Sequence, residues 1–86
     1  MDWMVKVETR LKESILDPQG QAVKKGLEAL GYQGIGDVHV GKYMELELSN
    51  IETRVRVRDT VEEMCQRLLA NPVIEDYSYQ IEKREG

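Results

Sequence analysis

The sequence has very little of several residue types on which small functional sites depend. Its 86 residues contain one cysteine, one histidine and no phenylalanine. The single cysteine, Cys65, cannot form an internal disulfide, which favours a reducing cytoplasmic setting. Together with His39 it is also too little to build a metal cluster of histidines and cysteines. We therefore expect neither a disulfide-stabilised secreted domain nor a metal site.

Long apolar runs and an excess of positive charge are absent as well. No stretch of about 18 apolar residues could span a membrane, and no signal peptide is recognisable, so we expect no membrane association. The net charge of −4 argues against a nucleic-acid binder, whose phosphate contacts need a basic surface. Charges of both signs are mixed along the chain, which is typical of a soluble folded domain. The length allows one domain, covering residues 1–86.

Alternation of apolar and polar residues predicts strands in three segments. In residues 3–11, the mainly apolar parity consists of Trp3, Val5, Val7, Thr9 and Leu11. Residues 38–48 alternate in the same way and form either one bent strand or a hairpin folded at Gly41-Lys42, because glycine permits both. The last alternating segment is residues 73–82. Each strand is expected to place one face on a core and the other in water.

The tetrapeptide Asp17-Pro18-Gln19-Gly20 separates the first strand from a helical pattern. Its residues suit a type I turn, and Asp17 equally suits the N-cap of a helix that begins at Pro18. The apolar stripe of this helix is Val23, Leu27 and Leu30, and Gly31 stands where a C-terminal glycine belongs. We expect a helix between Pro18 and Gly31.

Residues 50–72 carry two conflicting patterns. The run "TRVRVR" alternates like a strand, and Thr60 with Glu63 could then form a capping box that starts a short helix. Alternatively, one helical stripe runs through the whole segment and stops at Asn71-Pro72. The members of this stripe are Val57, Val61, Met64, Cys65, Leu68 and Leu69. We favour a helix over residues 53–70.

The predicted order is therefore β-α-β-β-α-β, an α+β domain with two helices on one face of an antiparallel sheet. The edge strands of such a sheet present unpaired backbone groups, which favours pairing with a second copy. A small domain of this size also has a modest core that self-association would supplement.

Few residues suggest chemistry. The Asp17–Gly20 turn lacks the lysine or arginine that would hold a phosphate, so neither a Walker loop nor an acylphosphatase-like site is expected. RNA-binding domains of similar order expose aromatic rings for base stacking, whereas this chain is acidic and has no phenylalanine. We expect His39 to be an ordinary surface or interface residue and Cys65 to be a buried, unreactive thiol. Lys42 and Tyr43 suit either a turn or a partner contact, combining a charge with an amphipathic ring.

Several segments together resemble one known family. The segments "LKESILDPQGQAV", "LGY", "VGKYMELEL" and "MCQRLLANPVIEDY" are similar to those of the PurS family, the small subunit of phosphoribosylformylglycinamidine synthase. The resemblance runs in order from about residue 5 to residue 81. Its poorest part is "NIETRVRVRD", where family members usually show a plainer helix rich in alanine and glutamate.

The resemblance implies a function that composition alone could not suggest. PurS proteins are non-catalytic dimers in the step that converts formylglycinamide ribonucleotide to its amidine. They join a glutaminase (glutamine amidotransferase) subunit to a synthetase subunit and support ammonia transfer between them. ATP, magnesium and glutamine are then used by the partner subunits, with no cofactor in this chain. The resemblance leaves open whether the dimers pair further into tetramers.

We expect the partner contacts at the turns and at the centre of the chain, at Asp17, Gln19, Gly20, Lys42, Tyr43 and Asn71. A second hypothesis remains at this point, which is a free-standing ferredoxin-like regulatory module that binds a small ligand at a dimer interface.

Overall fold

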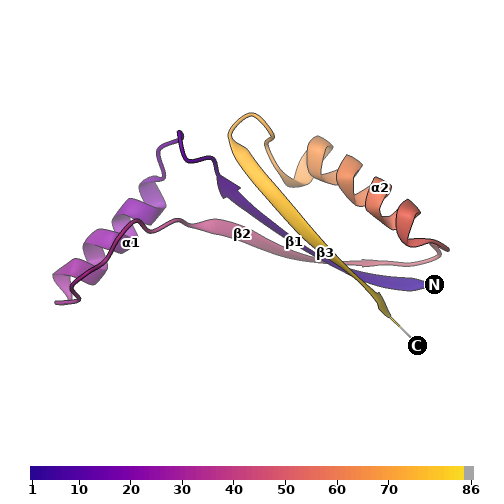
Figure 1. The fold of residues 1–86 in the computed structure, drawn as a ribbon, viewed down its shortest axis with the longest axis horizontal. Helices are drawn as coiled ribbons and strands as arrows, with labels where there is room; N and C mark the ends of the chain where they lie inside the picture. The colour runs from indigo at the N-terminus through magenta and orange to yellow at the C-terminus, as the bar shows by residue number, and fades with distance from the viewer. Residues whose placement is uncertain (85–86) are drawn as a thin grey trace.

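The structure is a computed structural model that describes residues 1–84, and it consists of three antiparallel strands and two helices (Figure 1). Along the chain these are β1 (Asp2–Leu11), α1 (Pro18–Ala29), β2 (Gly41–Leu48), α2 (Arg54–Met64) with a π-helical turn η1 (Cys65–Leu69), and β3 (Glu75–Arg84). The predicted α+β class and antiparallel sheet are confirmed. Of the two arrangements open for residues 38–48, the chain adopts one strand that begins at Gly41.

The first strand is central, and the strand order is β2-β1-β3. Val5 lies opposite Leu46 of β2 and Ile81 of β3, so the apolar parities of all three strands meet on one face. On this face Trp3, Val5 and Val7 are buried, as their alternation predicted. The outer edges of β2 and β3 have no neighbouring strand within residues 1–84.

The second helix covers this apolar face, and its position settles the ambiguity of the sequence. Val57, Val61 and Cys65 are fully buried against β1, whereas Val55 is 56% exposed. A strand would have placed Val55 and Val57 on the same side, and only a helix separates them. Thr53 is the N-cap, because its Oγ1 accepts a hydrogen bond from the backbone N–H of Arg56 at 3.2 Å. The helix predicted over residues 53–70 is therefore correct.

The Thr60–Glu63 capping box does not form. Thr60 lies inside α2, and its hydroxyl donates to the carbonyl oxygen of Arg56 at 2.7 Å. The helix widens near its end, where the N–H of Ala70 reaches back to the carbonyl of Cys65 at 3.0 Å. Within residues 1–84, neither helix combines the length and the apolar character needed to cross a membrane.

The first helix begins and ends where the sequence predicted, but its position relative to the sheet differs from the prediction. Asp17 is its N-cap, Pro18 is its first residue, and Gly31 follows it with φ of +96°, a conformation that favours glycine. The expectation of two helices on one face of the sheet is wrong for α1, which lies beyond the start of β2 (Figure 1). Its only buried residue is Gly20. The physical reason is the corner at Asp17, whose carboxylate ties the start of α1 to the start of β2.

Candidate interface residues

The carboxylate of Asp17 fixes the corner where the chain leaves the sheet and enters α1. Its Oδ1 accepts the backbone N–H of Gly20 at 2.8 Å, and its Oδ2 accepts the N–H of Val40 at 2.9 Å. These two hydrogen bonds lower the pKa of Asp17, with a smaller contribution from His39, whose Nδ1 lies 3.9 Å from Oδ2. Asp17 is therefore a buried structural acceptor that ties the start of α1 to the start of β2.

Gly20 completes the corner because there is no room for a larger residue. A Cβ at this position would overlap the carbonyl oxygen of Val38 and lie 2.8 Å from Oδ2 of Asp17. Of the three candidate contacts predicted here, Asp17 and Gly20 are buried, and only Gln19 offers an exposed side chain. Asp17 and Gly20 therefore fix the backbone of the corner, and neither offers a side chain to a partner.

Glu75 brings together two further predicted residues that are far apart in the sequence. One carboxylate oxygen, Oε1, accepts the backbone N–H of Asn71 at 2.7 Å, and the other, Oε2, lies 3.7 Å from Nζ of Lys42. Asn71 also stabilises its own turn, since its Oδ1 accepts the N–H of Val73 at 3.1 Å. Lys42 and Asn71 therefore lie at the same end of the sheet, next to the Asp17 corner that holds Val40.

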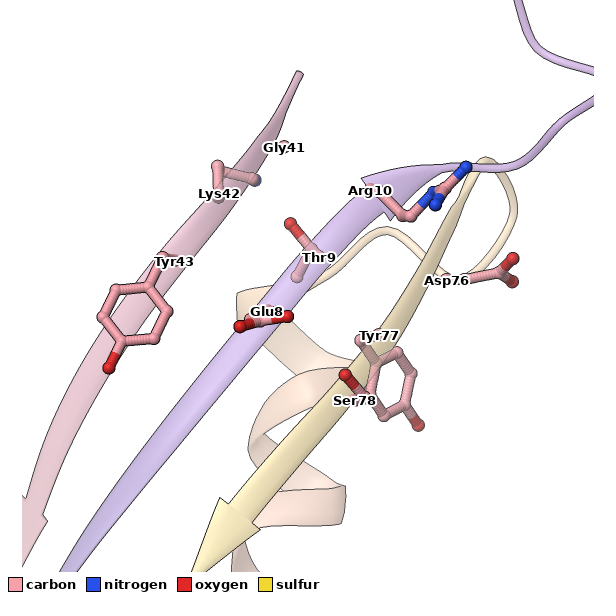
Figure 2. Close-up of a pocket in the computed structure, with 9 residues that line it drawn as sticks. All are labelled: Glu8, Thr9, Arg10, Gly41, Lys42, Tyr43, Asp76, Tyr77 and Ser78. Carbon is pink, nitrogen blue, oxygen red and sulfur yellow. The ribbon is translucent and has the colours of Figure 1, made fainter. Parts of the chain in front are cut away.

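A shallow depression of about 340 Å³ lies at this end (Figure 2). We call this region the sheet end, and nine residues line its depression: Glu8, Thr9, Arg10, Gly41, Lys42, Tyr43, Asp76, Tyr77 and Ser78. Tyr43 is 52% exposed, and Thr9 is buried. The hydroxyl of Thr9 has no hydrogen-bond partner within residues 1–84, which is an unfavourable state for a buried polar atom.

Behind the sheet end, one carboxylate joins α2 to β3. Glu62 accepts hydrogen bonds from the hydroxyls of Tyr77 and Tyr79, the latter at 3.0 Å. The bond to Glu62 raises the pKa of Tyr77, and burial followed by the bond to Glu62 raises that of Tyr79. Cys65 is fully buried, as predicted, and burial raises the pKa of its thiol. A protonated, inaccessible thiol is not a nucleophile.

The sequence predicted several residues of this site but not the residues that hold them together. Glu75, Val40 and Glu62 were not predicted, because each acts through contacts with residues distant along the chain. The alternation of β3 does place Glu75, Tyr77 and Tyr79 on one parity, which was the available signal. His39 is partly exposed, which agrees with the surface position expected for it. Within residues 1–84, no group of three or more histidine, cysteine, aspartate or glutamate side chains is arranged to hold a metal ion.

Comparison with known proteins gives one consistent family. The family model described as "PurS: Phosphoribosylformylglycinamidine (FGAM) synthase" matches residues 4–83. A curated relative, phosphoribosylformylglycinamidine synthase subunit PurS of Bacillus subtilis, is 49% identical over 81 residues, which is 94% of each chain.

Solved structures agree with this comparison. The structure of Bacillus subtilis PurS superposes with a TM-score of 0.82 at 49% identity, covering 94% of this chain and 99% of that one. A structure described as PurLQS from Thermotoga maritima gives a TM-score of 0.85 at 24% identity, covering 95% of this chain and 99% of that chain. At that identity the second likeness shows the fold alone.

Proposed function

Because the chain belongs to the PurS family of phosphoribosylformylglycinamidine synthase, we propose that it is the small, non-catalytic subunit of this synthase in purine biosynthesis. The observation that carries this proposal is the extent of the likeness, which spans nearly the whole of this chain and nearly the whole of its Bacillus relative. We therefore assign to this chain the role of the entire relative and not that of a single domain. These relatives do not favour the free-standing ligand-binding module.

The chain acts by assembly in this proposal. It joins the glutaminase subunit to the synthetase subunit, so that ammonia released from glutamine reaches the ATP-dependent step without escaping. ATP, magnesium and glutamine are bound by those partners, and no cofactor is assigned to this chain. The Bacillus relative is named as a subunit of the synthase, which supports membership of a larger complex. The setting is the cytoplasm, where the pathway supplies the substrate.

The sheet end is the surface that we assign to a partner subunit. It combines an exposed amphipathic ring at Tyr43, a charge at Lys42 and a rigid turn at Asn71. Aromatic residues with a few charges around them are typical of interface cores.

A homodimer is the unit that we propose for this role. Both edge strands of the sheet lack a neighbour within residues 1–84, and unpaired edges favour association. The dimer gives the complex two equivalent copies of the sheet end.

Reconstitution tests the proposed function. The synthetase and glutaminase subunits from the same organism are assayed for amidation with and without this chain, once with glutamine and once with ammonium chloride as the nitrogen source. We expect glutamine-dependent amidation to require the chain and ammonium-dependent amidation to depend on it less. Equal glutamine-dependent rates in its absence would refute the proposal.

A charge reversal tests the assignment of the sheet end in the same assay. Lys42→Glu should weaken glutamine-dependent amidation, because it places a second carboxylate beside Glu75 and reverses the charge offered to the partner. Lys83→Glu is the matched control, since Lys83 is exposed and lies opposite Trp3 at the other end of the sheet. If both variants behave like the unchanged chain, the partner docks elsewhere.

A further inference from the structure

Every second residue of β3 turns its backbone polar groups toward the outer edge of the sheet. In an antiparallel pair, opposite residues alternate between pairs that exchange backbone hydrogen bonds and pairs that do not. The N–H of Lys12 donates to the carbonyl of Ile74 at 2.9 Å, and the same register continues along β1 and β3. The even-numbered residues of β3 therefore bond to β1. The odd-numbered residues point the other way, to an edge with no neighbouring strand within residues 1–84.

The chain itself occupies this edge near both ends of β3. At one end, the N–H of Glu75 donates to the carbonyl of Asn71 at 2.7 Å. Toward the other end, Nη1 of Arg54 donates to the carbonyl of Ile81 at 2.8 Å. Beyond Ile81, the next outward residue is Lys83, and a lysine on an edge disfavours pairing with another strand. The two ends of the edge are therefore closed to a long added strand.

A short open stretch remains between these two ends. Tyr77 and Tyr79 each direct an N–H and a C=O to the edge, and no backbone partner within residues 1–84 reaches them. We call Tyr77, Ser78 and Tyr79 the β3 window. The window is held in place, because Glu62 of α2 accepts hydrogen bonds from both tyrosine hydroxyls. A segment that binds there meets backbone groups that are already ordered, which favours binding.

The two faces of the window differ in chemistry. The rings of Tyr77 and Tyr79 lie on the core face and are only partly buried, so they offer apolar surface beside the edge. Ser78 lies on the opposite face, where its cross-strand neighbour is Glu8 (Figure 2). A strand added at the window would therefore place alternate side chains against the tyrosine rings and near Glu8.

The charge around the window favours a basic occupant. Glu8 forms no ion pair within residues 1–84. Of the cations on the same face, Lys6 lies 3.2 Å from Glu82, and Arg10 lies opposite Asp76 in the register. A second copy of β3 would add its own Asp76 and Glu82 to this face, which places more carboxylates near Glu8. A basic segment of a different protein is therefore a better match than a second copy.

We propose that the β3 window binds a short extended segment of a partner subunit as an added strand, with a lysine or arginine opposite Ser78 and an apolar residue on either side. This inference rests on the proposed function and names the chemistry of the partner segment. The main-chain hydrogen bonds supply affinity, and the alternate side chains supply specificity. The cation reaches Glu8 across the small side chain of Ser78. The edge of β2 is left for the proposed homodimer.

Hydrogen exchange resolved to single amides tests the added strand in the unchanged chain. In the chain alone, the outward amides of Tyr77 and Tyr79 should exchange fast, and the inward amides of Ser78 and Gln80 should exchange slowly. The measurement is repeated with the synthetase subunit, with the glutaminase subunit and with both. We expect a partner to slow exchange at Tyr77 and Tyr79 by tenfold or more and to change Ser78 and Gln80 much less.

The other outcomes overturn the inference in distinguishable ways. Slow exchange at Tyr77 and Tyr79 in the chain alone would show that a second copy covers the window. Fast exchange in a complex that carries out glutamine-dependent amidation would remove the added strand and keep the assembly function. If neither subunit binds and amidation does not require the chain, both proposals fail.

A proline substitution tests whether an outward N–H takes part in binding. Tyr79→Pro removes that N–H without removing a hydrogen bond to β1, so an edge strand tolerates it. Tyr79→Val is the matched control, because it loses the same ring and hydroxyl but keeps the N–H. The Kd for the partner should be at least tenfold higher for Tyr79→Pro than for Tyr79→Val, with similar melting temperatures for the two. Equal Kd values would contradict the added strand.

A charge reversal tests the basic character of the partner segment. Glu8→Lys should raise the Kd for the partner by about tenfold or more, because it places a like charge beside the incoming cation. Glu52→Lys makes the same change at an exposed position outside the sheet and should leave the Kd unchanged. Equal Kd values for the two variants would show that the partner segment is not basic at this position.

Discussion

Oδ2 of Asp17 accepts a hydrogen bond from the backbone N–H of Val40, 23 residues further along the chain, at 2.9 Å. The same carboxylate caps α1 through Gly20. One side chain therefore holds the start of α1 and the start of β2 together, at the two ends of the segment that leaves the sheet. It sets where α1 points, and so which surfaces remain open to a partner.

Acid should weaken this corner. The pKa of Asp17 is lowered from its ordinary value of 3.8. The bonds of Asp17 therefore stabilise the fold fully above about pH 4, and that stability is lost as the pH falls through the lowered folded-state pKa. Asp17→Asn should lose less stability between pH 5 and pH 2 than the unchanged chain, as measured by urea unfolding at a fixed protein concentration. Asp37→Asn removes one exposed carboxylate and is the control, and an acid profile of Asp17→Asn parallel to that of the unchanged chain would contradict this role.

Substitution of Gly20 should be much more damaging than that of an unconstrained glycine. Gly20→Ala forces its Cβ into the carbonyl of Val38, so the corner must open or α1 must shift. Nothing lies within 4 Å of a Cβ at Gly36, so Gly36→Ala serves as the control. Thermal unfolding should show a drop of several degrees for the first variant and almost none for the second. Similar melting temperatures would mean that the corner relaxes at little cost.

The two valines at the start of α2 should differ strongly in their effect on stability. Val57→Ala removes two buried methyl groups beneath the helix and should cost about 2 kcal/mol of unfolding free energy. Val55→Ala makes the same chemical change at a 56% exposed position and should fall within about 0.5 kcal/mol of the unchanged chain. Urea denaturation of both variants measures the difference. Equal costs would show that α2 is rotated about its axis.

Cys65 should react slowly with thiol reagents while the chain is folded. It is fully buried, and burial raises the pKa of its thiol, so little thiolate is present and none is accessible. Leu68→Cys in a Cys65→Ala background is the matched control, because residue 68 belongs to the same turn and is 84% exposed. We expect the control to react at the rate of a free thiol and the native Cys65 only on unfolding. Comparable rates would place η1 differently.

Local patterns predicted those parts of the fold that depend on neighbours in sequence. The alternation of Trp3, Val5 and Val7 identified a strand and its buried face. The spacing of Val57, Val61 and Cys65 favoured a helix over the competing alternation of "TRVRVR". In both cases the side-chain period follows from backbone geometry, so the period is visible in the sequence.

The candidate site was predicted less completely. Lys42 and Asn71 share one end of the molecule because the register places Lys42 opposite Thr9 and Glu75 opposite Leu11, and Glu75 then contacts both. That contact links residues up to 33 positions apart, and no local pattern encodes such a distance. Gln19 remains an exposed side chain at the corner, with no contact that assigns it a role.

The sequence by itself determined the α+β class, the ends of α1 and the core face of the sheet, because each follows from residue type and spacing over a few positions. Only the tertiary structure decided that α1 leaves the sheet. An aspartate N-cap is compatible with many directions of the helix relative to the sheet. The second carboxylate oxygen of Asp17 fixes one direction, because it accepts the N–H of Val40. The direction of a helix is set by contacts across its connecting loop, and these exist only once the chain has folded.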